Sequence, residues 1–170
     1  MQVKIKKLHE NAVVPFKAYD KDFCYDVVAV SEEEIAPNVW KYKLGIAMQI
    51  ERLEEHIGSI YESVFPGEGL RDCVLSLGDS PINLSLDFRP RSSIYKTGMV
   101  LANSEPTIDE GYTGEIALVF YHVIPDMPRY KVGDKIAQMK IGATFPIEFE
   151  EVSDFEVTQR GEEGFGSSGK

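Results

Sequence analysis

Acidic and aromatic residues stand together in the segment Thr107–Glu115, which reads T-I-D-E-G-Y-T-G-E. Apolar runs flank it, Gly98–Ala102 before and Ile116–Val123 after, so we expect a polar hairpin turn between two strands. Asp and Gly tolerate the backbone angles that tight reversals require. A carboxylate at the end of a rigid sheet, as Asp109 would be, can orient a water molecule or a metal ion, and Tyr112 could pack on a flat ligand. An ordinary surface turn explains the same residues, so this segment alone does not decide the chemistry.

Four further segments carry residues of the kind that bind phosphate groups or a divalent cation. They are Y-D-V-V-A at 25–29, R-P-R-S-S-I-Y-K at 89–96, G-D-K-I-A-Q-M at 133–139 and the glycine-rich tail at 160–170. Backbone N–H groups freed by glycine, next to serine hydroxyls and an arginine, form a ready cradle for phosphates. Phe165 in the tail has no apolar partner nearby in sequence and could stack on a base. A flexible chain end explains the tail equally well when it is taken alone.

Read in order with residues 107–115, the four segments resemble the five ordered motifs of the trimeric deoxyuridine triphosphatase (dUTPase) family. The resemblance spans nearly the whole chain except Arg52–Pro81. Each motif is weak evidence by itself, whereas five in this order and spacing are strong evidence. The resemblance implies a distorted β-barrel or jelly-roll fold and a homotrimer with active sites shared between subunits. It also implies Mg²⁺-dependent hydrolysis of dUTP to dUMP and pyrophosphate by in-line attack of water on the α-phosphate.

The resemblance further assigns roles to single residues. Asp109 would orient the attacking water and take its proton, and Asp26 would hold the Mg²⁺ ion through water. Tyr112 would pack under the sugar and exclude a ribose 2′-hydroxyl, while the backbone of the turn would read the edge of uracil. The other predicted substrate contacts are Arg91, Ser92, Ser93, Asn103, Ile108, Gln138, Arg160, Phe165, Gly166, Ser167 and Ser168.

Two residues depart from the family pattern. Ser93 stands where many members carry glycine, and we interpret it as a variant because some relatives have serine there. Glu163 replaces the glycine usually found two residues before the stacking phenylalanine. An acid so close to the predicted phosphate contacts affects how the tail would close over the site.

Composition limits the remaining possibilities. The chain has 170 residues, of which 43% are hydrophobic and 27% charged, as expected for one globular domain. No apolar run approaches the roughly 18–20 residues that span a bilayer, and the N-terminus lacks a signal peptide, so we expect a cytoplasmic protein without membrane contact. The net charge of −10 argues against binding to nucleic acid through its phosphate backbone. The acidic runs 31–34 and 148–151 are interpreted as solvated loops and strand ends.

Alternating apolar residues predict strands near 3–5, 25–30, 40–51, 84–88, 116–123, 135–141 and 147–150, hence an all-β fold. Residues 52–81 are the exception, because apolar residues recur there at helical spacing and indicate a short helical insertion. We therefore expect a β-rich core over 1–158, containing the insertion, and a flexible arm over 159–170 that closes over the active site.

Two alternatives compete with dUTP hydrolysis. The related dCTP deaminases carry a catalytic glutamate where this chain has Val119, and an arginine where it has Lys96. Valine cannot transfer a proton, so the residue chemistry favours the hydrolase. A non-catalytic trimeric binding or regulatory protein on the same scaffold is the second alternative. The insertion favours it because long extra loops often carry interactions, whereas the presence of both Asp26 and Asp109 favours an enzyme.

Overall fold

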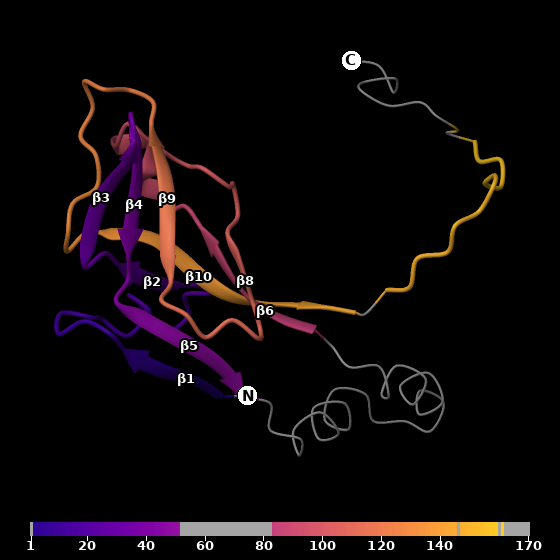
Figure 1. Ribbon diagram of the computed structural model, residues 1–170, viewed down its shortest axis with the longest axis horizontal. Helices are drawn as coiled ribbons and strands as arrows, with labels where there is room; N and C mark the ends of the chain where they lie inside the picture. The colour runs from indigo at the N-terminus through magenta and orange to yellow at the C-terminus, as the bar shows by residue number, and fades with distance from the viewer. Residues whose placement is uncertain (1, 52–82, 146, 160, 162–170) are drawn as a thin grey trace.

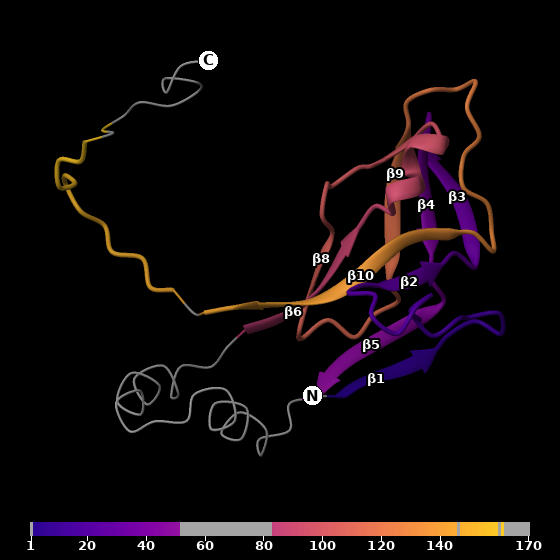
Figure 2. The same cartoon turned by 180° about the vertical axis from the view of Figure 1, so that it is seen from behind.

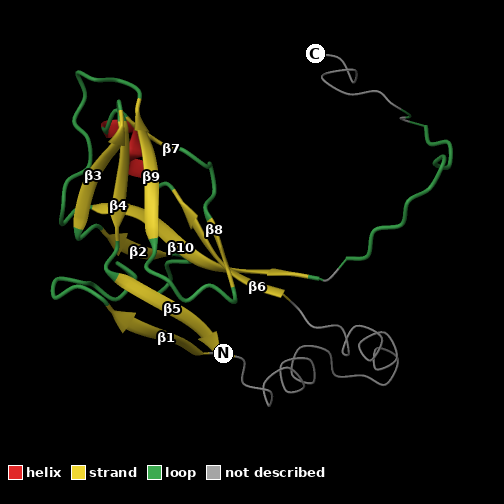
Figure 3. Cartoon of the chain, viewed as in Figure 1, coloured by secondary structure: helices red, strands yellow, loops and turns green. Residues whose placement is uncertain are grey.

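The computed structural model describes residues 2–51, 83–145, 147–159 and 161 (Figure 1). Strands dominate the described part of the chain, and its helical content is one short 3₁₀ helix (Figure 3). The elements are β1 (Gln2–Lys7), β2 (Tyr25–Val28), β3 (Ser31–Ala36), β4 (Val39–Lys43), β5 (Ile46–Glu51), β6 (Asn83–Arg89), η2 (Ser92–Lys96), β7 (Met99–Leu101), β8 (Thr107–Asp109), β9 (Ala117–His122) and β10 (Lys135–Thr144).

The strands form three small antiparallel sheets around one core, which confirms the predicted all-β fold. Two sheets have four strands each, in the orders β2-β10-β6-β8 and β3-β4-β9-β7, and β1 pairs with β5 alone. The sheet β3-β4-β9-β7 crosses over β2-β10-β6-β8, and the β1-β5 ribbon lies along one end (Figures 1 and 2). The predicted helical insertion at 52–81 lies outside the described residues.

The two faces of the sheet β2-β10-β6-β8 differ because side chains alternate along its strands. On β6, Leu86 and Phe88 are buried against the core, whereas Ser85, Asp87 and Arg89 point to the opposite face. The same alternation on β10 and β2 gives one apolar face and one polar face. The polar face carries the predicted site residues Asp26, Gln138 and Asp109.

The core centres on three aromatic rings, two from the sheet β3-β4-β9-β7 and one from the loop before β10. Tyr42 and Phe120 are fully buried, and their ring centroids lie 5.7 Å apart in an edge-to-face arrangement. Tyr130 completes the group, and its carbonyl oxygen accepts a hydrogen bond of 2.8 Å from the Tyr42 hydroxyl. The buried Tyr42 hydroxyl therefore has a hydrogen-bond partner inside the aromatic cluster.

The segment 107–115 is not a simple hairpin. The two flanking runs do pair, since Met99 lies opposite His122 and Leu101 opposite Phe120. The chain between them, however, crosses to the other sheet and forms β8 along the edge of β6. The turn itself is present, because the Tyr112 amide donates a 3.0 Å hydrogen bond to the Asp109 carbonyl oxygen.

Two other local predictions are wrong. Residues 31–34 belong to the edge strand β3, whose acidic side chains are tolerated because an edge is open to solvent. The predicted strand at 147–150 does not form, since no described strand pairs with these residues. No helix among the described residues is long and apolar enough to cross a bilayer.

We predict that Phe120→Ala lowers the free energy of unfolding by about 3–5 kcal/mol, because it removes a fully buried ring and leaves a cavity. Urea unfolding at fixed protein concentration measures the change. Tyr121→Ala in the same strand is the control, since Tyr121 is 47% exposed and should change stability by less than about 1 kcal/mol. Equal losses in both variants would contradict the assignment of Phe120 to the core.

Candidate active site

The carboxylate of Asp26 is the point at which three of the predicted motifs meet. It lies on β2 with only 3% of the residue exposed. Arg91 Nε donates to Asp26 Oδ1 at 2.9 Å, and Lys135 Nζ lies 3.0 Å from Oδ2. Gln138, directly opposite Asp26 in the β2-β10 ladder, donates from Nε2 to Oδ1 at 3.4 Å. Residues separated by as many as 112 positions in sequence thus converge on one carboxylate.

The backbone of Asp26 is fixed as firmly as its side chain. Its amide donates to the Phe16 carbonyl oxygen at 2.7 Å, and the Phe16 amide donates back at 3.2 Å. The Phe16 ring also lies beneath Lys135, whose Nζ is 4.6 Å from the ring centroid. Lys135 is therefore held between an aromatic ring and a carboxylate.

Charge around Asp26 keeps the carboxylate ionised. Burial raises the pKa of Asp26, but the hydrogen bond from Lys135, the charge of Arg91 and the hydrogen bond from Gln138 together hold that pKa below its ordinary value. Two cations surround one anion, so the cluster is net positive. Such a cluster suits an anionic ligand such as a phosphate group.

Arg91 is positioned by the short helix that follows it. Its backbone is extended and caps η2, where the Ile94 amide donates to the Arg91 carbonyl oxygen at 3.0 Å. The helix then presents Ser92 on the surface and Ser93 partly buried, directly after the arginine. The predicted pair of residues for phosphate contact is therefore adjacent in space as well as in sequence.

Asp109 and Tyr112 occupy the opposite edge of the same sheet. Asp109 is exposed at the end of β8, and Tyr112 is 46% exposed, with its hydroxyl donating to the Glu115 carbonyl oxygen at 3.0 Å. A Cβ at Gly114 would come within 2.5 Å of the Tyr112 hydroxyl oxygen, so a larger residue there would displace the Tyr112 ring. The turn thus holds an exposed carboxylate and an exposed aromatic ring three residues apart in sequence.

Within one chain the structure does not bring Asp109 next to Asp26. Asp26 lies on β2 and Asp109 on β8, at the two ends of the strand order β2-β10-β6-β8. With neighbouring strands about 4.8 Å apart, three spacings separate them by roughly 14 Å before any offset along the strands. The predicted base and the predicted phosphate-binding cluster therefore form two separate half-sites.

The other predicted contacts differ in where they lie. Asn103 is exposed in the turn after β7, and the side chain of the partly buried Ile108 packs against the core. Val119, which stands at the deaminase glutamate position, is a half-buried residue of β9. The predicted tail contacts Arg160, Phe165, Gly166, Ser167 and Ser168, and also Glu163, lie outside the described residues.

Lys135 is a site residue that the sequence reasoning missed. The register of β10 against β2 shifts between Lys135 and Ala137, and this irregularity brings Lys135 beside Asp26. Simple alternation along β10 cannot locate such a shift. The sequence signal that could have identified Lys135 as a site residue is its position three residues before Gln138 in the same motif.

Fold and half-sites together define an all-β protein with a cationic cluster suited to an anionic ligand and a separate exposed carboxylate. A sequence profile described as dUTPase matches residues 81–169. The deoxyuridine 5′-triphosphate nucleotidohydrolase of Clostridium novyi is 31% identical over 171 aligned positions, covering 99% of each chain. This protein therefore belongs to the dUTPase family, and the predicted resemblance is confirmed.

Solved structures agree with the fold. The dUTPase of Staphylococcus bacteriophage 80alpha, as a variant with dUpNHpp, superposes with a TM-score of 0.71 at 21% identity, over 99% of each chain. A variant dUTPase from phage phi11 of S. aureus, which coordinates a structural Mg(II) ion, gives a TM-score of 0.63 at 18% identity, over 92% of this chain and 100% of the other.

We predict that Asp26→Asn lowers the free energy of unfolding by about 1–2 kcal/mol at pH 7, because charge-assisted hydrogen bonds to Arg91 and Lys135 are lost. The pKa of Asp26 is depressed in the fold, so its ionised carboxylate contributes fully to the free energy of unfolding above the unfolded-state pKa of about 4. This contribution disappears as the pH falls through the folded-state pKa. The gap between wild type and variant should therefore narrow below about pH 4.

Urea unfolding at several pH values measures this gap. Asp126→Asn is the control, because Asp126 is an exposed loop residue whose change should stay within about 0.5 kcal/mol. A gap that widens at low pH would contradict the ionised state assigned to Asp26.

Proposed function

We propose that this protein hydrolyses dUTP to dUMP and pyrophosphate, with Asp109 as the general base and the Asp26 cluster binding the phosphates. One observation carries the proposal. Asp26, Arg91 and Gln138, from three segments that match family motifs in order, converge through hydrogen bonds of 2.9 and 3.4 Å. A structural ion pair alone would not require the serine pair that follows Arg91.

The cationic half-site has the donors that a triphosphate needs. The Arg91 guanidinium has further N–H groups beyond Nε, and Ser92, Ser93 and Gln138 add hydroxyl and amide donors. These groups would bind the phosphate oxygens and stabilise negative charge as it develops during cleavage. Fixed donors cost little reorganisation at the moment of reaction, which favours turnover over mere binding.

A Mg²⁺ ion would be held near Asp26 through water and together with the substrate phosphates, whose negative charge offsets the cations of the cluster. Both oxygens of Asp26 already have protein partners, and no cluster of three or more His, Cys, Asp or Glu side chains among the described residues could hold a metal directly. Mg²⁺ keeps most of its waters and takes phosphate oxygens as ligands, so one carboxylate in the outer shell is sufficient. When bound with the substrate, the ion would neutralise phosphate charge.

Asp109 and Tyr112 form the second half-site. The exposed Asp109 carboxylate would orient the attacking water and accept its proton. Tyr112 would pack under the deoxyribose and leave no space for a 2′-hydroxyl, while backbone groups near Ile108 and Asn103 would read the uracil edge. Hydrogen bonding to the substrate's own polar edge discriminates between bases more strongly than an apolar pocket does.

A homotrimer would join the two half-sites. Within one chain they lie at opposite edges of a sheet, so a complete site needs Asp109 of one subunit beside the Asp26 cluster of another. The segment after β10 extends away from the body of the fold (Figure 1). Its large apolar side chains are exposed, among them Phe149 at 92% and Phe155 at 87%. Burial against another copy of the chain would remove this surface from water.

The arm would complete the site. We propose that residues 1–158 form the core and that 159–170 close over the bound nucleotide. Arg160, Ser167 and Ser168 would wrap the triphosphate, with Gly166 allowing close backbone approach. Phe165 would stack on the uracil ring.

Product analysis with Mg²⁺ against dUTP, dCTP, dTTP and UTP tests the proposed reaction. We expect dUMP and pyrophosphate from dUTP alone, and a loss of at least about 10²-fold in kcat for Asp109→Asn with nucleotide affinity retained. Asp126→Asn, an exposed carboxylate on another loop, is the matched control. Ammonia release from dCTP would contradict the hydrolase assignment despite Val119, and no turnover of any nucleotide would indicate a binding protein.

Sedimentation equilibrium tests the proposed trimer. The mass should be about 57 kDa, which is three times the chain mass of 19.1 kDa. Phe149→Asp places a charge on the proposed buried surface and should shift the protein towards monomer, whereas Lys4→Met on the exposed face of β1 should not. A monomeric wild-type protein with full dUTP turnover would exclude shared active sites.

A further inference from the structure

Strand β8 (Thr107–Asp109) is short for the task proposed for it. It has three residues, lies at the edge of its sheet and pairs with β6 alone. Short edge strands open locally at low free-energy cost. A misplacement of about 1 Å in a reacting group can cost roughly 10²-fold in rate. A base at the end of β8 therefore needs support beyond three residue pairs.

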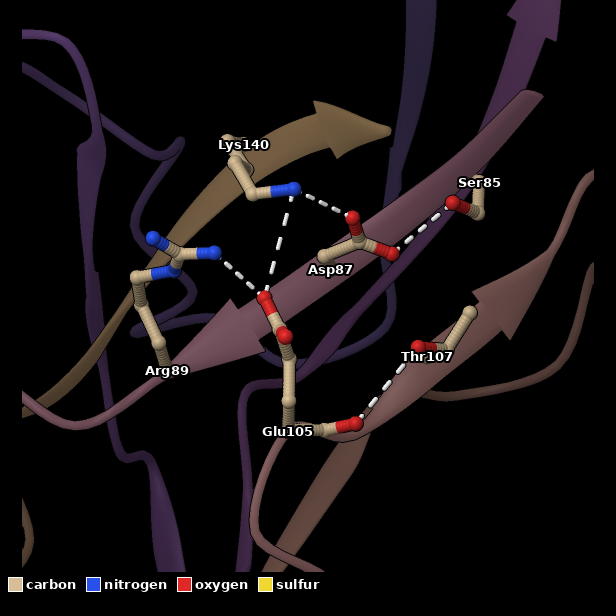
Figure 4. A network of polar contacts seen from close by, with 6 residues as sticks. All are labelled: Ser85, Asp87, Arg89, Glu105, Thr107 and Lys140. Atoms are coloured by element: carbon tan, nitrogen blue, oxygen red, sulfur yellow. Dashed lines mark hydrogen bonds and ion pairs between the residues drawn. The ribbon is translucent and has the colours of Figure 1, made fainter. Parts of the chain in front are cut away.

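A group of charged and polar side chains forms hydrogen bonds and ion pairs next to β8 (Figure 4). Lys140 Nζ on β10 lies 2.5 Å from Asp87 Oδ2 on β6 and 4.0 Å from Glu105 Oε1, two residues before β8. Ser85 Oγ donates to Asp87 Oδ1 at 2.8 Å, and Arg89 donates to Glu105. We refer to Ser85, Asp87, Arg89, Glu105 and Lys140 as the Lys140 cluster.

The register places the Lys140 cluster directly beside β8. Asp87 lies opposite Thr107, and Ser85 lies opposite Asp109. Directly paired residues project on the same face of a sheet, so the cluster and Asp109 share the polar face. The Phe88 amide also donates to the Pro106 carbonyl oxygen at 2.8 Å, which anchors the chain between Glu105 and β8.

The centre of the Lys140 cluster is well shielded from water. The Asp87 side chain is 12% exposed and that of Lys140 is 21% exposed. Burial raises the pKa of Asp87, but hydrogen bonds from Lys140 and Ser85 more than offset this and hold that pKa below its ordinary value. Removing one partner of such a pair leaves the other charge uncompensated.

Gly142 gives the Lys140 cluster its space. This residue lies opposite Ser85 in the β10-β6 ladder, and a Cβ there would overlap both Asp87 and Ser85. Glycine is therefore needed for the side chains of β6 to lie across β10. The cluster depends on a specific small residue as well as on its charges.

We propose that Lys140 is a positioning residue for Asp109. It holds Asp87 and Glu105 together, and through them it fixes β8 on the sheet without touching the substrate. This inference rests on the role proposed above for Asp109. Lys140 lies outside every segment matched to the family motifs, although it follows Gln138 by only two residues on the same strand.

Steady-state kinetics with dUTP and Mg²⁺ tests the proposal on Lys140→Met, Lys140→Arg and the control Lys4→Met. Lys140→Met should lower kcat about 10–100-fold with KM within about threefold, because substrate contacts are unchanged while the base is misplaced. Lys140→Arg keeps the charge and should restore kcat to within about threefold of wild type. Lys4 forms an exposed 2.7 Å ion pair with Glu51, and its loss should leave kcat unchanged.

A double-mutant cycle separates this proposal from the role of Asp109. If Lys140 acts through Asp109, Lys140→Met should lower kcat no further in the Asp109→Asn background. Hydrogen exchange of the Thr107–Asp109 amides should also speed up at least about tenfold in Lys140→Met and stay unchanged in Lys4→Met. A folded Lys140→Met protein with wild-type kcat and wild-type exchange would overturn the proposal.

Two further outcomes are also decisive. If Lys140→Met does not fold, Glu105→Gln replaces it, since the Glu105 side chain is 48% exposed, and it should lower kcat about 3–10-fold. If Asp109→Asn retains full turnover, the assignment of the base fails. Faster hydrogen exchange of the β8 amides in Lys140→Met would then still show that the Lys140 cluster stabilises that strand. Unchanged exchange would overturn the role of the cluster as well.

Discussion

The sheet β2-β10-β6-β8 must carry charges on one face while its other face builds the core. Alternation along each strand enforces this division, because a shift of one residue would exchange the two faces. Asp26 and Asp87 are the two buried carboxylates of the described chain, and each is paired with a lysine from β10. Strand β10 therefore supplies apolar side chains to the core and the lysines that compensate the buried carboxylates on the polar face.

The two carboxylates have related surroundings and different uses. Asp26 has cations on both oxygens and lies beside Arg91 and the serine pair, where ligand phosphates would add negative charge. Asp87 is balanced within the sheet by Lys140 and Ser85 and has no comparable excess of positive charge. Excess cationic charge thus distinguishes a site built for an anion from a cluster that holds strands together.

Motif order gave the family, and alternation gave most of the strands. Strands β6, β9 and β10 follow directly from their apolar periodicity, and the motifs alone predict Asp26, Arg91 and Gln138 as site residues. Sequence reasoning failed where pairing decided the outcome. It interpreted the acidic run of edge strand β3 as solvated loops and strand ends and predicted a strand at 147–150, because alternation does not reveal whether a neighbouring strand is present.

The sequence by itself determined the chemistry of this protein, namely the residue types available for phosphate, base and water and their order along the chain. Only the tertiary structure decided which of them meet. The register shift that brings Lys135 to Asp26 and the crossing of 102–116 between two sheets depend on contacts between distant segments. The placement of Asp109 at the edge opposite Asp26 depends on strand order, which is set by packing and backbone pairing over the whole fold.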